Sequence, residues 1–188
     1  MKCFLVKKKK KRKKNFLCKN RLSNDVTIFS HSGKMNRQKK TIELIKIFTN
    51  TKQQNWRLFI AGEFDDSISI EANELINKDS RIIYLGFLDL KNLTDLLCAT
   101  DLYMQPLSPS QTAQTAMGCL TPVMLANIND YIGYEESGSI YINNTNEISD
   151  IFDKINKGQI NLKEASQKTE KFAIDNLNYI NAENNLFK

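Results

Sequence analysis

The chain has 188 residues, 41% of them hydrophobic, and a formal net charge of +6 at pH 7. This length suffices for a single domain with a substantial hydrophobic core. The four cysteines lie far apart, with no CxxC pair and only one histidine in the chain, at Cys3, Cys18, Cys98 and Cys119. This pattern argues against a zinc site and a disulfide framework. We expect no cofactor, because the sequence requires no metal. We expect Cys98 and Cys119 to be buried thiols in a reducing compartment.

The positive charge is concentrated at the start of the chain. Residues 1–22 hold 11 Lys or Arg and no acidic residue, whereas residues 23–188 hold 16 basic and 21 acidic residues, a net charge of −5. A segment this basic buries too little apolar surface to fold alone, so we predict that residues 1–22 form a disordered tail. Because a nucleic-acid binder is expected to carry its basic residues on the folded surface, we rank RNA or DNA binding last among the functions considered.

The tail also bears on cellular location. It is not a signal peptide, because its apolar residues are few and precede the charges, and no run of 18 apolar residues follows anywhere in the chain. We predict a cytoplasmic protein. A polybasic segment gains roughly 1 kcal/mol per Lys or Arg near an anionic bilayer, so residues 1–22 are a candidate for peripheral attachment to the inner face of a membrane. The alternative is a solvated tail without a partner.

From residue 24 onward, short apolar runs flanked by turn-forming residues alternate with helical periodicity. We predict strands at Val26–Phe29, Trp56–Ala61, Arg81–Leu85, Leu102–Gln105, Pro122–Leu125 and Ser139–Ile142. Helices are predicted at Thr41–Lys52, within Ser67–Asn77, and at Lys91–Ala99, Gln111–Cys119, Ile148–Lys157 and Leu162–Leu177. This alternation indicates an α/β fold, a Rossmann-like parallel sheet flanked by helices, formed by residues 23–188 and ending in a C-terminal helix.

Ligands of such sheets bind beyond the carboxyl ends of the strands. The loops at that edge are His31–Lys40, Gly62–Asp66, Gly86–Asp89, Pro106–Ser110 and Ala126–Tyr131. The first of them leads into a helix start, where free N–H groups favour anions, and it contains Gly33, Lys34 and Lys39. We therefore predict a phosphate site there, the alternative being a solvated helix start. We expect the only histidine, His31, to be a packed or capping residue.

Five segments of the chain resemble a known family in their order and spacing. They are Ile28–Lys34 followed by Lys39, Trp56–Gly62, Ile82–Phe87, Leu93–Pro106 and Ala116–Val123. Together they resemble the C-terminal, donor-binding half of GT-B retaining glycosyltransferases of the type that builds bacterial surface polysaccharides. The resemblance covers about residues 26–157 and implies that the chain binds a nucleotide-sugar.

In this family an Arg shortly after a Gly, and a Lys five residues later, clamp the donor diphosphate. Lys34 and Lys39 stand at these positions, after Gly33, so the resemblance implies that these three residues bind the diphosphate. Lysine keeps the charge but lacks the bidentate fork of arginine.

The chain departs from the family at three other positions. The two glutamates that the family places eight residues apart fall on Leu107 and Thr115, and Leu120 replaces the glycine before the Thr-Pro pair. No catalytic residue is therefore assigned. The nearby hydrogen-bonding side chains are candidates for binding the nucleotide or sugar, namely Ser110, Gln111, Gln114 and Thr115.

Two functions follow from the resemblance and its departures. The first is the donor-binding domain of a glycosyltransferase, which transfers a hexosyl group from a nucleotide-sugar to a polysaccharide or glycolipid acceptor. GT-B enzymes have two halves, so this domain would need an N-terminal half on another polypeptide. The second is a catalytically degenerate interaction domain, or a truncated remnant without activity. Nucleotide binding that depends on Lys34 and Lys39 distinguishes the first from the second.

Overall fold

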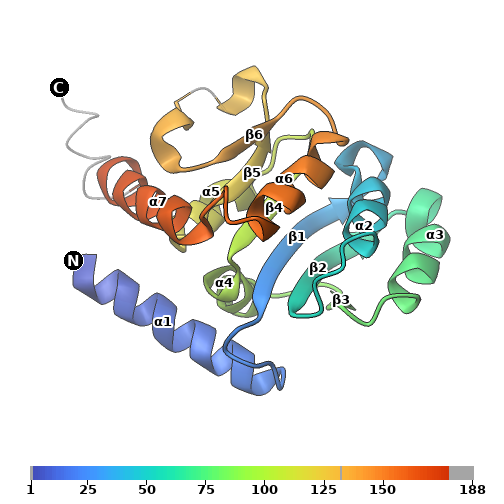
Figure 1. Cartoon of the computed structure of the whole chain (residues 1–188), viewed down its shortest axis with the longest axis horizontal. Coiled ribbons are helices and arrows are strands. Elements are labelled where there is room, and N and C mark those ends of the chain that lie inside the picture. Colours follow the sequence, from blue (N-terminus) through green and yellow to red (C-terminus); the bar gives the residue numbers. More distant parts are fainter. Residues whose placement is uncertain (1, 132, 178–188) are drawn as a thin grey trace.

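The computed structural model describes residues 2–131 and 133–177, so residues 178–188 of the predicted domain lie outside the described residues. A six-stranded sheet runs through the centre of the molecule (Figure 1). All its pairings are parallel, in the order β3-β2-β1-β4-β5-β6. The strands are β1 (Thr27–Met35), β2 (Trp56–Phe64), β3 (Ile82–Tyr84), β4 (Leu102–Gln105), β5 (Val123–Ala126) and β6 (Ile140–Ile142). The predicted α/β fold with a Rossmann-like parallel sheet is confirmed.

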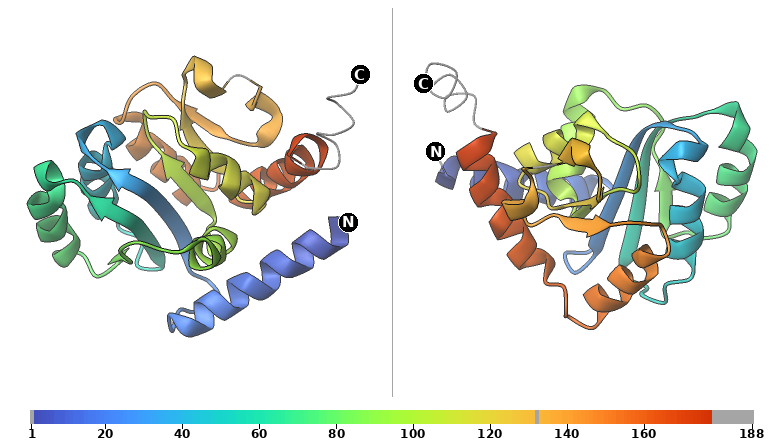
Figure 2. Two further views of the ribbon diagram at one scale, coloured as in Figure 1. Left: turned by 180° about the vertical axis from the view of Figure 1, so that it is seen from behind. Right: turned by 90° about the horizontal axis from the view of Figure 1, so that it is seen from above.

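Helices cover both faces of this sheet (Figure 2). The helices are α1 (Lys2–Lys19), α2 (Thr41–Thr49), α3 (Asp66–Asn77), α4 (Leu90–Ala99), α5 (Gln111–Gly118), α6 (Glu147–Asn156) and α7 (Leu162–Asn176), with short 3-10 turns η1 (Arg37–Lys39), η2 (Asn129–Tyr131) and η3 (Glu135–Ser137). Residues of α2, α3 and α6 pack on one face, and residues of α1, α4, α5 and α7 on the other. In β4, for example, Leu102 and Met104 join the first core and Tyr103 joins the second. This alternation follows from the two-residue period of a strand.

Strands β1 and β2 are longer than the sequence predicts. The predicted strands end at Phe29 and Ala61, whereas the observed pairing continues to Met35 and Phe64 and sets Gly33 opposite Gly62. Both glycines have left-handed φ values, +134° and +121°. A Cβ on Gly62 would lie 2.0 Å from the carbonyl oxygen of Gly33, so this approach requires glycine. The predicted turn at 31–40 is therefore partly strand, and α2 begins at Thr41, as predicted, but ends at Thr49.

The N-terminal segment differs from its prediction more strongly. Instead of a disordered tail, α1 is a helix that lies alongside α4 (Figure 1). Phe16 and Leu17 are buried against the domain, and the Phe16 ring meets the Phe59 ring edge-on at 5.2 Å between centroids. These two apolar residues anchor a lysine-rich segment, and lysine is a favourable helix residue.

Three cations of α1 are also bound by the acidic body. Arg12 pairs with Asp95, and the Lys13 Nζ lies 2.5 Å from an oxygen of Asp101. The Lys9 Nζ donates to the Leu120 carbonyl at 2.6 Å. The prediction of disorder was wrong because it treated the basic segment separately from the acidic surface on which it packs. Among the described residues, no helix combines the length and hydropathy of a membrane span.

We predict that Gly62→Ala destabilises the protein severely, because the new Cβ would collide with the Gly33 backbone at a left-handed φ. We expect a loss of about 3 kcal/mol or more, measured by urea denaturation followed by circular dichroism. Gly118→Ala is the matched control, since a Cβ at this helical position meets nothing within 4 Å and should change stability by about 1 kcal/mol or less. Equal stability of the two variants would contradict the account of this contact.

Candidate functional site

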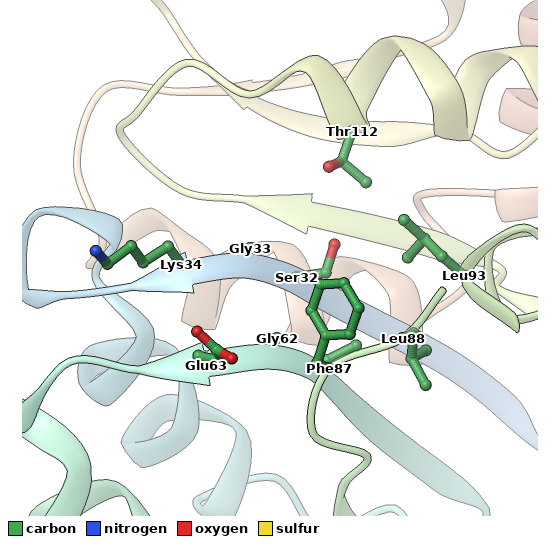
Figure 3. A pocket seen from close by; sticks show the side chains of 10 residues that line it. Ser32, Gly33, Lys34, Gly62, Glu63, Phe87, Leu88, Leu93 and Thr112 are labelled. Atoms are coloured by element: carbon green, nitrogen blue, oxygen red, sulfur yellow. The ribbon is translucent and has the colours of Figure 1, made fainter. Parts of the chain in front are cut away.

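A pocket of about 240 Å³ opens at the carboxyl ends of β1 and β2 (Figure 3). Several elements that are distant in sequence converge on it, as expected at this edge of a parallel sheet. The lining residues are Ser32, Gly33 and Lys34 of β1, Ala61, Gly62 and Glu63 of β2, Phe87 and Leu88 after β3, Leu93 of α4, and Thr112 of α5. Three of the five loops that the sequence identified by position contribute to this lining.

The floor of the pocket is backbone rather than side chain, because Gly33 and Gly62 pair there. The Gly62 N–H donates to the Gly86 carbonyl at 2.7 Å, and the Tyr84 hydroxyl donates to the Gly62 carbonyl at 2.8 Å. These bonds fix the floor to the loop that carries Phe87. A floor without Cβ atoms allows a ligand to approach the main chain closely.

The two ends of the pocket differ in chemistry (Figure 3). Lys34 and Glu63, which are register partners on β1 and β2, lie at one end, and both are exposed. Phe87, Leu88 and Leu93 form the other end, where the Phe87 side chain is 76% exposed although it is aromatic. An exposed aromatic ring in a pocket is suited to stacking on a flat ligand group. The pocket therefore suits a ligand with one charged and one flat apolar part.

A second lysine lies beside the charged end. A Cβ on Gly33 would lie 3.9 Å from the Cε of Lys39, so this side chain runs past the glycine. The Lys39 Nζ donates to the Pro109 carbonyl at 3.2 Å, and burial lowers the pKa of its amino group. The structure thus places the Lys39 side chain beside Gly33, which precedes Lys34, although Lys39 itself does not line the pocket.

The start of α2, which was predicted to offer free N–H groups to a phosphate, does not line the pocket. The Asn36 side chain accepts hydrogen bonds from the N–H groups of Gln38 and Lys39, at 3.0 and 3.1 Å, so the loop caps itself. Thr41, the first residue of α2, is fully buried. None of these residues lines the pocket, because the extended β1 separates Gly33 from the start of α2.

His31 is a packing residue, which confirms the prediction. Its ring is fully buried, with Nδ1 2.8 Å from the Met104 carbonyl and Nε2 2.9 Å from the Thr41 hydroxyl. Because a carbonyl only accepts, Nδ1 carries the proton and Nε2 accepts from Thr41. Burial lowers the pKa of His31 to about 4, so the ring is neutral at pH 7. His31 therefore ties β1 to β4 and to α2.

Ser110 does not line the pocket but helps to position Thr112, which does. Its hydroxyl oxygen accepts from the Thr112 N–H at 3.2 Å and caps α5, while its own N–H donates to the Tyr131 hydroxyl at 2.9 Å. Ser110 thereby fixes the first turn of α5, from which Thr112 faces the pocket.

The other three candidates on α5 are placed differently. Gln111 and Gln114 are exposed, and the Gln114 amide donates to the Tyr134 hydroxyl at 2.7 Å. The Thr115 hydroxyl donates back to the Gln111 carbonyl at 3.3 Å. None of the three lines the pocket, because only the start of this short helix faces it.

Among the polar and aromatic lining residues, no role was predicted from the sequence for Ser32, Glu63 or Phe87. Glu63 and Phe87 fall in loops that the strand pattern had identified by position, but nothing in that pattern identified these side chains as lining residues. Within residues 2–131 and 133–177, no cluster of three or more His, Cys, Asp or Glu side chains could hold a metal ion.

Comparison with known proteins assigns this geometry to a family. The family model described as glycosyl transferases group 1 matches residues 27–157. A search of curated protein sequences finds no match.

Solved structures show the same fold at low sequence identity. Alr3699/HepE from Anabaena, in complex with UDP, has a TM-score of 0.76 and 17% identity, over 94% of this chain and 51% of that chain. The C-terminal domain of a group 1 glycosyl transferase (LpcC) from Francisella tularensis has a TM-score of 0.70 and 17% identity, over 86% of this chain and 90% of that chain. WaaG, a glycosyltransferase involved in lipopolysaccharide biosynthesis, has a TM-score of 0.70 and 14% identity, over 86% of this chain and 46% of that chain.

The coverage shows which part of these proteins the chain matches. It spans about half the length of HepE and WaaG, but 90% of the isolated C-terminal domain of LpcC. Three observations indicate the same family. They are the parallel sheet with its pocket at the ends of β1 and β2, the family match over residues 27–157, and the fold of these neighbours. The chain belongs to the glycosyl transferases group 1 family, and its fold is that of the C-terminal half of a GT-B enzyme.

Proposed function

We propose that the chain is the donor-binding domain of a glycosyltransferase that moves a hexosyl group from a nucleotide-sugar to a polysaccharide or glycolipid acceptor. The observation that supports this most directly is the pocket at the ends of β1 and β2, which has Lys34 at its charged end with Lys39 close by, and an exposed Phe87 at the other end. A nucleoside diphosphate has the same division into an anionic and a flat aromatic part. HepE, one of the neighbours, binds UDP in its crystal structure, and WaaG is involved in lipopolysaccharide biosynthesis.

The diphosphate would bind over Gly33 and Gly62, between Lys34 and Lys39. Each charge-assisted contact contributes about 1.5–3 kcal/mol, and the bare backbone allows the phosphate oxygens to come close. When the sugar leaves, negative charge grows on the diphosphate, and the same lysines would stabilise it electrostatically.

The base would stack on Phe87, with Leu88 and Leu93 beside it, since a base on an aromatic side chain gains roughly 1–3 kcal/mol. The Glu63 carboxylate and the Thr112 hydroxyl would then bind hydroxyl groups of the ribose or the sugar. We assign this role to Glu63 and Thr112 instead of Gln114 and Thr115, because only the first two line the pocket.

Transfer requires an acceptor site as well. Leu107 and Thr115 stand where the family has carboxylates, so this chain offers no acid at either position. In GT-B enzymes the reaction takes place between two halves, and we propose that a partner polypeptide supplies the N-terminal half and the acceptor site.

We also propose that α1 holds the protein at the anionic inner face of a membrane, from the cytoplasm. Its inward side is occupied by Lys9, Arg12 and Lys13, which contact the body. Four further lysines, at 7, 10, 11 and 14, are exposed and share one side of the helix by their three- and four-residue spacing. A fixed row of lysines suits a surface of anionic headgroups.

The donor site is tested by calorimetric titration of the full chain with UDP, GDP and nucleotide-sugars. The full chain is needed because removing α1 would uncover Phe59 and Leu96. We expect UDP or GDP to bind, and Lys34→Ala/Lys39→Ala to weaken binding by about 100-fold or more. Lys52→Ala/Lys78→Ala makes the same charge change at the opposite edge of the sheet and should leave affinity within about twofold. A folded protein that binds no nucleotide would instead support the alternative, a catalytically degenerate interaction domain.

The membrane proposal is tested by flotation with phosphatidylglycerol and phosphatidylcholine vesicles. At roughly 1 kcal/mol per lysine, changing Lys7, Lys10, Lys11 and Lys14 to Gln should weaken binding to the anionic vesicles by about 100-fold or more. Changing Lys52, Lys78, Lys91 and Lys154 to Gln alters the net charge equally and should have little effect. Equal flotation of both variants, or salt-sensitive binding to RNA without flotation, would overturn the proposal.

A further inference from the structure

Two cysteine thiols meet beneath α1, away from the donor pocket. Cys98 is buried in the last turn of α4, and Cys119 is the half-buried C-cap residue of α5. Both line a cavity of about 150 Å³, whose wall on the α1 side contains Lys8, Lys9 and Arg12. This cavity shares no lining residue with the pocket at the ends of β1 and β2. It brings together a pair of thiols and cationic side chains at a point that solvent can reach.

The two thiols are not equivalent. A hydrogen bond from the Cys119 thiol, together with the charges of Lys9 and Arg12, lowers the pKa of Cys98 to about 7 in spite of burial. The same hydrogen bond, with burial, raises the pKa of Cys119. The hydrogen bond between the two thiols therefore favours the thiolate at one sulfur and the protonated thiol at the other. The thiolate is the reactive form of cysteine, and a neighbouring thiol is what resolves an oxidised one.

Lys9 holds the cationic side of the cavity in place. Its Nζ donates to the Leu120 carbonyl at 2.6 Å and to the Thr121 hydroxyl oxygen at 2.9 Å, in the residues that directly follow Cys119. This side chain reaches the end of α5 from α1, so the docked helix supplies the charge that faces the thiols.

We propose that Cys98 and Cys119 are a peroxide-reactive thiol pair that oxidises reversibly to an intramolecular disulfide between the ends of α4 and α5. The inference does not depend on the proposed donor function. In the first step the Cys98 thiolate attacks one oxygen of hydrogen peroxide, the O–O bond breaks, and the departing hydroxide takes a proton to form water. Cys98 is then a sulfenic acid.

In the second step Cys119 gives up its proton and its sulfur attacks the sulfur of Cys98. The S–S bond forms, the S–O bond breaks, and the leaving hydroxide is protonated to a second water. Two thiols are oxidised by two electrons, and one peroxide is reduced to two waters. A dithiol reductant reverses the change by thiol–disulfide exchange.

The test is oxidation of the full chain with stoichiometric hydrogen peroxide, followed by blocking of free thiols, proteolysis and mass spectrometry. We expect a linked peptide that joins Cys98 to Cys119 and disappears on treatment with dithiothreitol. The Cys3→Ser/Cys18→Ser variant should form the same link at the same rate. Cys98→Ser and Cys119→Ser should each abolish it, and Cys119→Ser should accumulate sulfenic acid at Cys98.

Lys9→Met and Lys13→Met form a matched pair, because both remove an α1 cation but only Lys9 lines the cavity. We expect Lys9→Met to slow formation of the link by about fivefold or more, and Lys13→Met to leave the rate within about twofold. Peroxide that modifies Cys18 while the pair stays reduced, or that converts Cys98 to sulfinic acid without a link, would overturn the proposal. Equal rates for the two lysine variants would overturn the role given to Lys9.

Discussion

The close approach of Gly33 to Gly62 determines the rest of the site. With the Cβ position of residue 62 only 2.0 Å from the Gly33 carbonyl oxygen, the two main chains can stay paired there only if residue 62 is glycine. This contact extends β1 and β2 past the short strands β3 to β6 and forms a floor of bare backbone. Lys34 and Glu63 come directly after the two glycines, within the extended strands. Phe87 comes directly after Gly86, whose carbonyl accepts a hydrogen bond from the Gly62 N–H. The charged and apolar ends of the pocket are thus set by one backbone contact.

Charge is the second organising constraint. The first 22 residues are strongly basic and the remainder is acidic, and the two parts are joined where Arg12 and Lys13 reach Asp95 and Asp101. The same helix brings Lys9 to the end of α5, where Leu120 has a left-handed φ of +60° although it is not glycine. An L-residue in this conformation costs about 1–2 kcal/mol, and the family has glycine there. Leu120 is buried, so its packing offsets part of that cost.

Much of the fold follows from local patterns. All six strands and the helices from 41 onward were predicted, and apart from the carboxyl end of β1 their bounds lie within about three residues of the observed ones. Strands buried on both faces appear as short apolar runs, and helices with one buried face show a 3.6-residue period. The grouping of Gly33, Lys34 and Lys39 was also predictable, through the family resemblance. Three features could not be predicted in this way. They are the helix α1, the strand extensions at Gly33 and Gly62, and the lining role of Glu63 and Phe87. These features depend on contacts between residues distant in sequence, which a local pattern does not contain.

We propose that a nucleotide binds over the Gly33 and Gly62 backbone. The most direct measurement is a titration of the ¹⁵N-labelled full chain with UDP and GDP, followed by two-dimensional NMR of assigned amide signals. We expect the signals of Gly33, Lys34, Gly62, Phe87 and Thr112 to shift together and saturate, while those of Lys52 and Lys78 at the opposite edge stay fixed. Unchanged signals around the two glycines in a folded protein, or shifts confined to α1, would contradict this proposal.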